Sequence, residues 1–290
     1  PIENDNNESI FRDIIVKKIL ETICKNDHEK YDAILIDEGQ DFYVEWYQML
    51  CHFLTGRNEM VIVNDEKQNV YGRDNTWIRR NRDDMKQFSN WIELKKIMRL
   101  PEKIARISTN FAEKFNLNQD IKIGIIIKPD LFNQFSDNVI WWNIDENNWL
   151  SKVDEAYEII KKNAPHKQPS ETVILLPDKN FGFVCIKHFE LKKNLLINHV
   201  FEDEDEKKYH KHKKNFWMGD GRLKMSTIHS FKGFELTNVI IVIPSVIRGA
   251  EQLNDSLIYT AITRARENLI VINLSKRYWE FGKSYSDKWI

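Results

Sequence analysis

The chain has 290 residues, a length that suits two domains of ordinary size or one large domain. Its 43 Lys and Arg residues balance 44 Asp and Glu residues, and the net charge of -1 excludes a basic coat for holding nucleic acid over the whole surface. A hydrophobic content of 42% supports packed cores and excludes global disorder. The apolar runs are far too short to cross a bilayer and the acidic start does not resemble a signal peptide, so we expect a soluble, cytoplasmic protein without a membrane partner.

The first 90 or so residues alternate helical and extended patterns. The helical segments carry apolar residues every three or four positions, whereas the extended segments are short apolar runs without that period. This alternation predicts a parallel α/β layer, in which ligands lie beyond the carboxyl ends of the strands, where Asp37-Glu38 and Asp65-Glu66 fall. The predicted elements are a helix over 9–26 with Ser9 as its N-cap, a strand over 31–36, a helix over 44–54 and a strand over 60–63.

A second α/β series follows, and we place the domain boundary near residue 88, which gives domains 1–88 and 89–290. The segment 202–214 contains five acids followed by a stretch rich in Lys and His, a composition that predicts a solvated loop. The predicted elements are strands over 91–97, 138–144, 172–176, 222–227, 238–243 and 268–273, with helices over 101–115, 149–163 and 251–266.

Asp37 and Glu38 have the residue types that nucleoside triphosphate hydrolysis requires at the end of a strand. One carboxylate can hold Mg²⁺ while the next polarises the attacking water. An Asp-Glu pair alone is more often a surface turn, but four further motifs follow it in order. They are NDEKQNVY over Asn64–Tyr71, LKKIMR over Leu94–Arg99, TIHSFKGFE over Thr227–Glu235 and YTAITRAR over Tyr259–Arg266.

This series resembles motifs two to six of superfamily-one helicases of the UvrD/Rep type, over roughly residues 31–274. The resemblance implies an α/β fold of two RecA-like P-loop NTPase domains with parallel sheets, the first incomplete and the second complete. It implies ATP and Mg²⁺ as cofactors and single-stranded or partly duplex DNA as partner, with RNA as an open alternative. The implied activity couples ATP hydrolysis in an interdomain cleft to movement along the strand.

Carried over position by position, the resemblance also implies roles for single residues. Asp37 would bind Mg²⁺ and Glu38 would be the catalytic base. Gln68 would sense the γ-phosphate, and Arg99 and Arg264 would reach that phosphate from the second domain, where a guanidinium stabilises charge in the transition state. The remaining implied contacts are Tyr71, Gly233 and Glu235 with the nucleotide, and Thr227 and His229 with the nucleic-acid backbone.

Two motifs depart from the family pattern. Ile97 and Met98 replace an Asn and an aromatic residue, so Arg99 is the part of the fourth motif that is carried over. After Tyr71 the family commonly has a Trp and an Arg where this chain has Arg73 and Asp74, which leaves base stacking beside Tyr71 open. Trp77 is an alternative stacking residue and therefore a candidate nucleic-acid contact.

The phosphate-binding loop is the missing motif. It requires Gly, four residues and then Gly-Lys-Ser/Thr, between a strand and a helix. Gly282-Lys283-Ser284 has the second half of this pattern, but Arg277 stands where the first Gly is needed, so we interpret the match as chance. We therefore expect a C-terminal portion of a longer helicase, whose upstream part supplies the loop, and near-background ATP hydrolysis by these 290 residues alone.

Two other classes of function stay open. A helicase-like scaffold could bind nucleic acid or protein without hydrolysis, although binding alone has no need of a base such as Glu38. Asp178 with Glu190-Leu191-Lys192 fits the loose pattern of metal-dependent nucleases, but Glu190 falls in a segment that can be helical where that pattern needs a strand. His210 and His212 could bind a metal ion, but two-residue spacing in a Lys-rich loop is more typical of solvated charge.

Overall fold

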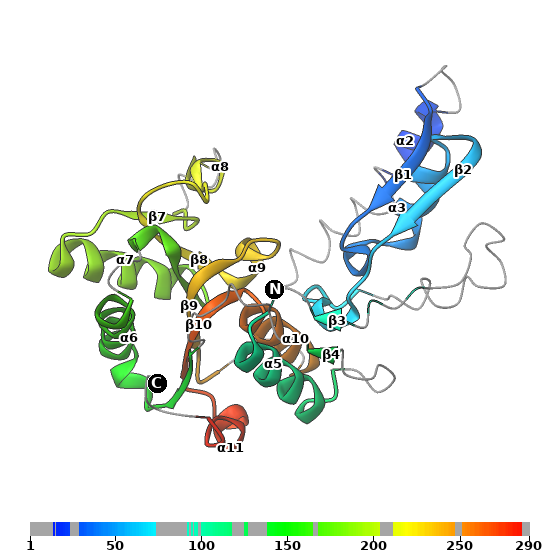
Figure 1. Ribbon diagram of the computed structural model, residues 1–290. Helices are drawn as coiled ribbons and strands as arrows, with labels where there is room; N and C mark the ends of the chain where they lie inside the picture. Colours follow the sequence, from blue (N-terminus) through cyan, green and yellow to red (C-terminus); the bar gives the residue numbers. More distant parts are fainter. Residues whose placement is uncertain are drawn as a thin grey trace. The chain divides into compact units, whose positions relative to one another are not determined.

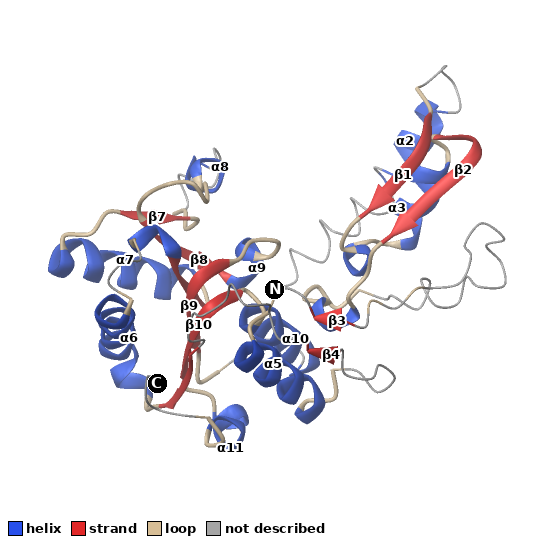
Figure 2. Ribbon diagram, in the orientation of Figure 1, coloured by secondary structure: helices blue, strands red, loops and turns tan. Residues whose placement is uncertain are grey.

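The structure, a computed structural model, describes residues 14, 16–23, 29–73, 92, 94, 96–97, 100–117, 125–126, 138–164, 168–203, 211–246 and 251–285. The chain divides into two compact units, Pro1–Glu93 and Leu94–Ile290. Every strand pair within the described ranges is parallel, which confirms the predicted α/β class with parallel sheets (Figures 1 and 2). In these ranges no helix is both long enough and apolar enough to cross a membrane.

The first unit contains a two-stranded parallel sheet with a small core on one face. β1 (Tyr31–Ile36) pairs with β2 (Leu54–Ile62), and the core forms where these strands meet α3 (Val44–Cys51). α2 (Val16–Ile23) packs against α3. The bounds of β1 are those predicted from the sequence. The predicted helix over 44–54 is too long, because the amide of Tyr31 already bonds to the carbonyl of Phe53 and so brings the following residues into the sheet.

The other face of this sheet carries exposed apolar side chains. Leu35 and Val61 are partners across the two strands, and they are 77% and 55% exposed. Tyr31 and Val63 are each 51% exposed. Parallel strands normally have both faces covered, so this arrangement is unusual. We refer to these four residues as the open strand face.

The second unit is built on a six-stranded parallel sheet with the strand order β5-β10-β9-β6-β8-β7. Helices cover both of its faces, as Figure 1 shows. The strands are β5 (Asn138–Asn143), β6 (Thr172–Leu176), β7 (Ile197–His199), β8 (Leu223–Thr227), β9 (Leu236–Ile243) and β10 (Ala265–Asn273). A separate pair consists of β3 (Lys96–Ile97) and β4 (Ile125–Ile126). The helices are α5 (Glu102–Lys114), α6 (Trp149–Asn163), α7 (Lys179–Lys193), α8 (Lys211–Asn215), α9 (Ile228–Phe231), α10 (Glu251–Ile262) and α11 (Trp279–Gly282).

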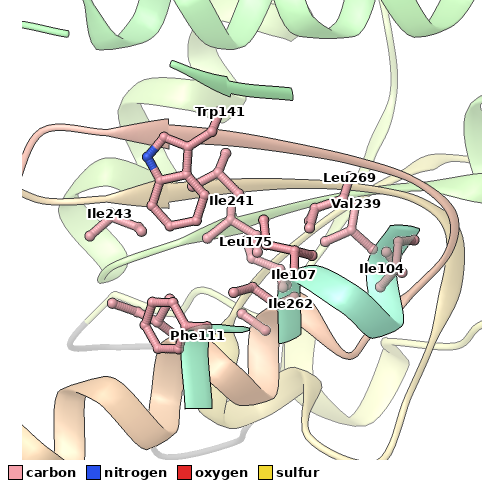
Figure 3. Packing of buried hydrophobic residues seen from close by; sticks show 14 of the residues in the cluster. Ile104, Ile107, Phe111, Trp141, Leu175, Val239, Ile241, Ile243, Ile262 and Leu269 are labelled. Carbon is pink, nitrogen blue, oxygen red and sulfur yellow. The ribbon is translucent and has the colours of Figure 1, made fainter. Parts of the chain in front are cut away.

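Two hydrophobic cores lie on opposite faces of the six-stranded sheet. Alternate residues of each central strand enter different cores, since neighbouring side chains on a strand point to opposite faces. Val239 and Ile241 of β9 pack with α5 and α10 in one core (Figure 3), whereas Ile240 and Val242 pack with α6 and α7 in the other. The continuous apolar runs in these strands follow from burial on both sides.

A ladder of buried amides crosses four neighbouring strands of this sheet. Asn138 donates to Asn268 (3.0 Å), Asn268 donates to Asn238 (2.7 Å), and Asn238 donates to the hydroxyl of Thr172 (3.2 Å). The four residues are partners in the strand register, and each is at most 3% exposed. Because a buried amide without a partner is costly, this ladder favours one register of the sheet.

A buried ion pair fastens α10 to the turn that precedes α11. The carboxylate of Asp255, which is 1% exposed, accepts two bonds from Arg277, from Nε at 3.0 Å and from Nη2 at 2.8 Å. The hydroxyl of the fully buried Tyr278 also donates to Asp255, at 2.8 Å. Burial raises the pKa of Tyr278, and the neighbouring carboxylate raises it further. Arg277, which drew attention in the sequence only as a mismatch to the phosphate loop, is therefore a structural residue.

Two sequence predictions for the second unit were wrong in detail. The helix predicted over 251–266 ends at Ile262, because Ala265 already pairs with Leu236 of β9. The solvated loop predicted over 202–214 contains the short helix α8, and Glu202 is only 6% exposed because its carboxylate accepts the amide of Lys213 (3.3 Å). Residues 204–210, including His210, and the predicted cap Ser9 lie outside the described residues.

Candidate functional site

The two acidic segments of the first unit meet at one edge of its sheet. The amide of Val63 donates to the carbonyl of Ile36, and the amide of Gly39 donates to the carbonyl of Val63, both at 2.8 Å. These bonds end β1 and β2 side by side. Asp37 and Glu38 therefore lie next to the turn that begins at Asp65, as expected for the carboxyl ends of parallel strands.

Glu38 has an unusual backbone conformation. Its φ of 53° and ψ of 45° lie in the left-handed region, which residues other than glycine adopt rarely and at a cost. Its carboxylate accepts a hydrogen bond from Nε2 of Gln40, whose side chain is fully buried. A strained backbone with a fixed carboxylate is typical of residues that act on a ligand.

The same buried amide links Glu38 to the neighbouring motif. Oε1 of Gln40 accepts the amide of Asp65 at 3.0 Å, and Oδ2 of Asp65 accepts Nε2 of Gln68 at 2.8 Å. The other oxygen of Asp65 accepts the amide of Lys67 at 3.1 Å and so fixes the turn. Glu38, Gln40, Asp65 and Gln68 thus form one hydrogen-bonded chain, which we call the Glu38–Gln68 relay.

Asp37 is exposed beside this relay. Its Oδ1 accepts the amide of Glu38 at 2.8 Å, which holds the carboxylate at the end of β1. Mg²⁺ prefers oxygen ligands and usually takes one or two carboxylates together with water and phosphate oxygens. An exposed carboxylate with a fixed position therefore fits a Mg²⁺ ligand.

Tyr71 lies in a group of aromatic rings around Arg73. The guanidinium of Arg73 is 5.0 Å from the Tyr71 ring, 4.5 Å from the Tyr43 ring and 5.0 Å from the Trp46 ring, within the range of cation–π contacts. Asn69 accepts the amide of Arg73 at 3.0 Å and donates to its carbonyl at 2.8 Å. The residue that replaces the family's Trp thus packs on Tyr71, which is still 46% exposed. Trp77, the alternative stacking residue, lies outside the described residues.

In the second unit, the predicted nucleic-acid contacts follow the end of β8. Thr227 caps α9, because its hydroxyl accepts the amide of Ser230 at 3.2 Å. His229, in the middle of this short helix, is exposed. Gly233 follows with a φ of +85° and open space around the position of a side chain, so the turn needs glycine for its backbone and not for lack of room.

Glu235 and Arg264 lie at the junction between β9 and β10. The carboxylate of Glu235 pairs with Arg266, which stands on β10. The amide of Leu236 donates to the carbonyl of Arg264 at 3.1 Å, so the two motifs touch through the backbone. Arg264 is only 3% exposed, and its guanidinium donates to the carbonyl of Thr260 and to the hydroxyl of Thr263, both at 3.0 Å. Arg99 lies outside the described residues.

Two segments of the chain match family models of helicases. Residues 5–88 match the UvrD/REP helicase N-terminal domain. Residues 223–272 match the UvrD-like helicase C-terminal domain. In both of these segments the chain is of the UvrD/Rep helicase type. The first match contains the Glu38–Gln68 relay, and the second contains the segments with Thr227 and Arg264.

Among solved structures, this chain is similar to the C-terminal domain of a possible DNA helicase from Lactobacillus plantarum WCFS1. The sequence identity is 14%, and the similarity covers 62% of this chain and 90% of that chain, with a TM-score of 0.40. No curated protein matches the chain at a significant level.

The structure places the UvrD/Rep-type motif residues in two groups. Asp37, Glu38 and Gln68 meet at one edge of the first unit, and the second group consists of Gly233, Glu235 and Arg264 in the second unit. The roles of these residues, and the assignment of the units to a first and a second RecA-like domain, remain predictions. Sequence reasoning missed Gln40, Asp65 and Arg266 as partners of motif residues. Their signal was weak, because polar residues near strand ends are common.

The nuclease interpretation finds no support in the geometry. Asp178 accepts the amides of Asn180 (2.8 Å) and Phe181 (3.1 Å) and so caps α7, while Glu190 lies on that helix and not on a strand. No group of three or more His, Cys, Asp or Glu side chains in the described part of the chain is arranged to hold a metal ion. Gly282 ends α11 and packs closely on Trp141, a place unlike that of a phosphate-binding glycine.

Proposed function

We propose that this chain is the C-terminal part of an ATP-dependent DNA helicase or translocase. In this proposal, hydrolysis of ATP between groups of the two units drives movement along single-stranded DNA. The match to UvrD/Rep helicase domains supports the class of activity. The Glu38–Gln68 relay is the observation that supports hydrolysis, since a pure binding surface has no need of a strained, amide-fixed carboxylate.

Glu38 acts as the base that orients and deprotonates the attacking water. Gln40 donates to Oε2 of its carboxylate and so holds the base in position. Gln68 contacts the γ-phosphate or its water, and a shift of its amide reaches Glu38 through Asp65 and Gln40. The relay thus ties the state of the phosphate to the position of the base.

Asp37 holds Mg²⁺, which supplies charge neutralisation for the phosphate oxygens when it is bound. Arg264 and Arg99 supply positive charge to the transferred phosphoryl group. An arginine of this kind contributes about 10³ to 10⁵ in rate when it reaches the transition state. In the structure Arg264 is 3% exposed and donates to Thr260 and Thr263, so this role requires its guanidinium to become accessible to the phosphate.

The phosphate-binding loop comes from outside these 290 residues in this proposal, on an upstream part of the same polypeptide. The open strand face supports this, because a parallel sheet is stable when both faces are covered. A helix that follows the loop would cover Leu35 and Val61 on the open strand face. The 290 residues alone are therefore expected to hydrolyse ATP at a near-background rate.

The test is the substitution Glu38→Gln in a longer chain that includes the phosphate-binding loop. We expect DNA-stimulated ATP hydrolysis to fall by about 10² or more, because base catalysis contributes about 10² to 10⁴. Binding of ATP should persist, because the substitution keeps the size and the hydrogen-bonding capacity of the side chain. Glu29→Gln, at an exposed position, is the matched control and should leave the rate unchanged.

An unchanged kcat in Glu38→Gln would refute the assignment of the base. Ordinary helicase rates of hydrolysis by the 290 residues alone would refute the need for an external loop. A scaffold that binds nucleic acid without hydrolysis would show DNA affinity and no ATP turnover in the longer chain. Cleavage of DNA that depends on metal and on Asp178, without ATP, would favour the nuclease instead.

A further inference from the structure

Trp217 presents a large aromatic surface at an unexpected place. It stands in the turn between α8 and β8, shortly after the charged segment 202–214, and it is 69% exposed. The proposed function gives this turn no role. Large aromatic residues bury most of their surface in folded proteins unless they meet a ligand or a partner. Its exposure therefore requires an explanation.

The indole ring of Trp217 packs on the backbone at Gly219. A side-chain carbon at Gly219 would overlap the six-membered part of the ring, so the ring packs directly on this glycine. The carbonyl of Trp217 accepts the amide of Asp220 at 3.2 Å and Nδ2 of Asn198 at 3.3 Å. The backbone of Trp217 is thus held by two hydrogen bonds and its ring packs on Gly219, while the exposed part of the ring remains for stacking.

The turn that carries this ring is built rigidly. Lys224, which is fully buried, donates from Nζ to the carbonyl of Asp220 at 2.8 Å and to the carbonyl of Ser170 at 2.9 Å. Arg222 binds the carboxylate of Asp220 through Nε (2.8 Å) and Nη2 (2.7 Å). A buried ammonium and a two-point ion pair both fix the backbone from residue 217 to residue 222. The ring therefore needs little ordering when a ligand arrives.

The surface next to Trp217 carries positive charge. Lys211, Lys213 and Lys214 of α8 are exposed. Of the described acids near α8, Asp220 is engaged by Arg222 and Glu202 is buried, whereas Asp203 is exposed. A rigid aromatic face beside several flexible ammonium groups suits a chain of stacked bases joined by phosphates.

Trp217 also lies close to the predicted nucleic-acid motif. Phe216, its neighbour in the chain, packs between the two hydrophobic cores, with its ring 6.5 Å from the Phe231 ring of α9 and 6.3 Å from the Phe234 ring. α9 is the helix that carries His229 and is capped by Thr227. The aromatic face and the motif are thus parts of one continuous region of the second unit.

We propose that Trp217, with Lys213 and Lys214, is a binding site for single-stranded nucleic acid in which a base stacks on the indole and the lysines contact flanking phosphates. This inference rests on the proposed function, because it extends the strand path past His229. It gives α8 and the turn that follows it a role in nucleic-acid binding, which the sequence pattern alone did not indicate.

Binding of a labelled oligothymidylate of about 15 nucleotides to the full chain, followed by fluorescence anisotropy at several salt concentrations, tests the proposal. Trp217→Ala should weaken binding by about 5- to 150-fold, the range expected for loss of one stacked base. Trp217→Phe should retain most of the affinity, since a smaller ring still stacks. Gly219→Ala should weaken binding with the ring still present, because the added carbon displaces the indole.

The charge on α8 is tested by the double substitution Lys213→Gln, Lys214→Gln. It should weaken binding and reduce the slope of log Kd against log salt by about 0.7 for each phosphate that the variant no longer neutralises. The matched control is Lys187→Gln, Lys192→Gln, which removes the same charge from exposed positions of α7. Leu196→Ala is the control for Trp217, because Leu196 is 73% exposed and lies away from the lysines in sequence.

The outcomes separate this inference from the proposed function. No binding of the oligonucleotide by the unsubstituted chain would overturn both. Binding that is weakened by His229→Ala but not by Trp217→Ala would leave the proposed function standing and overturn the stacking site. Equal reductions of affinity in the α7 and α8 double substitutions would overturn the role of Lys213 and Lys214.

Discussion

Replacement of Asp255 by alanine should destabilise the second unit strongly. The carboxylate is 1% exposed and accepts three hydrogen bonds, two from Arg277 and one from Tyr278. The substitution leaves the fully buried hydroxyl of Tyr278 without its acceptor, which costs about 1 to 3 kcal/mol. Breaking a buried ion pair costs about 3 to 5 kcal/mol, but the Arg277 side chain is 33% exposed and can be partly solvated.

These contributions overlap, and we expect the free energy of unfolding to fall by about 3 kcal/mol. For a unit of this size each kcal/mol lowers Tm by about 2 to 4 °C, so the second unit should melt about 6 to 12 °C earlier. Urea unfolding followed by circular dichroism measures the free energy, and calorimetry measures Tm.

Two further variants make the measurement specific. Tyr278→Phe removes only the hydroxyl and should cost about 1 kcal/mol. Glu280→Ala removes an exposed ion pair with Lys283 in the last turn, close in sequence, and should cost less than about 0.5 kcal/mol. A decrease below about 1 kcal/mol in Asp255→Ala, or one equal to that of Glu280→Ala, would show that the pair does not fasten α10 to this turn.

Three other predictions concern buried or linked polar groups. Burial, with His212 and Arg222 nearby, lowers the pKa of His199 from 6.5 to about 4. Between pH 6.5 and pH 4, His199 therefore binds a proton in the unfolded chain but not in the folded chain. Acidification over this range should lower the free energy of unfolding by roughly 2 to 3 kcal/mol. Unfolding of His199→Phe, which keeps a ring against His212, should show a flatter pH dependence, and an equal slope would contradict this. Asn268→Leu should cost about 2 to 4 kcal/mol in urea unfolding, because Nδ2 of Asn138 loses this acceptor and Oδ1 of Asn238 loses this donor; a cost below about 1 kcal/mol would mean the ladder is solvated. Gln40→Ala in the longer chain should lower kcat by less than Glu38→Gln does, because it loosens the base without removing it, and a kcat equal to that of the unsubstituted chain would remove Gln40 from the relay.

The alternation of strands and helices was predictable because burial on both faces produces short, continuous apolar runs. β1 and β6 have the bounds expected from the sequence. The end of α10 was not predictable in the same way. Thr263, Arg264, Ala265 and Arg266 continue a pattern rich in good helix formers, and the pairing of Ala265 with Leu236 overrides that preference.

The residues of the candidate site were predictable where a motif named them, but their connections were not. The proximity of the two acidic segments, which begin at Asp37 and Asp65, followed from parallel strands ending at one edge. The link through Gln40 depends on a left-handed turn at Glu38, which no propensity indicates for a glutamate. Asp255 and Arg277 are 22 positions apart, and nothing in their spacing suggests that they pair.

The structure of the segment around α8 was also not predictable, since its composition predicts only solvated charge. Its structure depends on tertiary contacts, among them the stacking of His212 on His199, with ring centroids 4.2 Å apart. The position of the Trp217 ring depends on the absence of a side chain two residues later. Such contacts are set by packing between elements and leave no periodic trace in the sequence.

The open strand face has a practical consequence for handling this chain. Leu35 and Val61 are neighbours across β1 and β2 and present a continuous apolar surface on the uncovered face of the sheet. Such surfaces recruit copies of themselves, so purified material should form dimers and larger species as its concentration rises. It should also brighten dyes that respond to apolar surface, and a charged substitution such as Val61→Lys should suppress both effects.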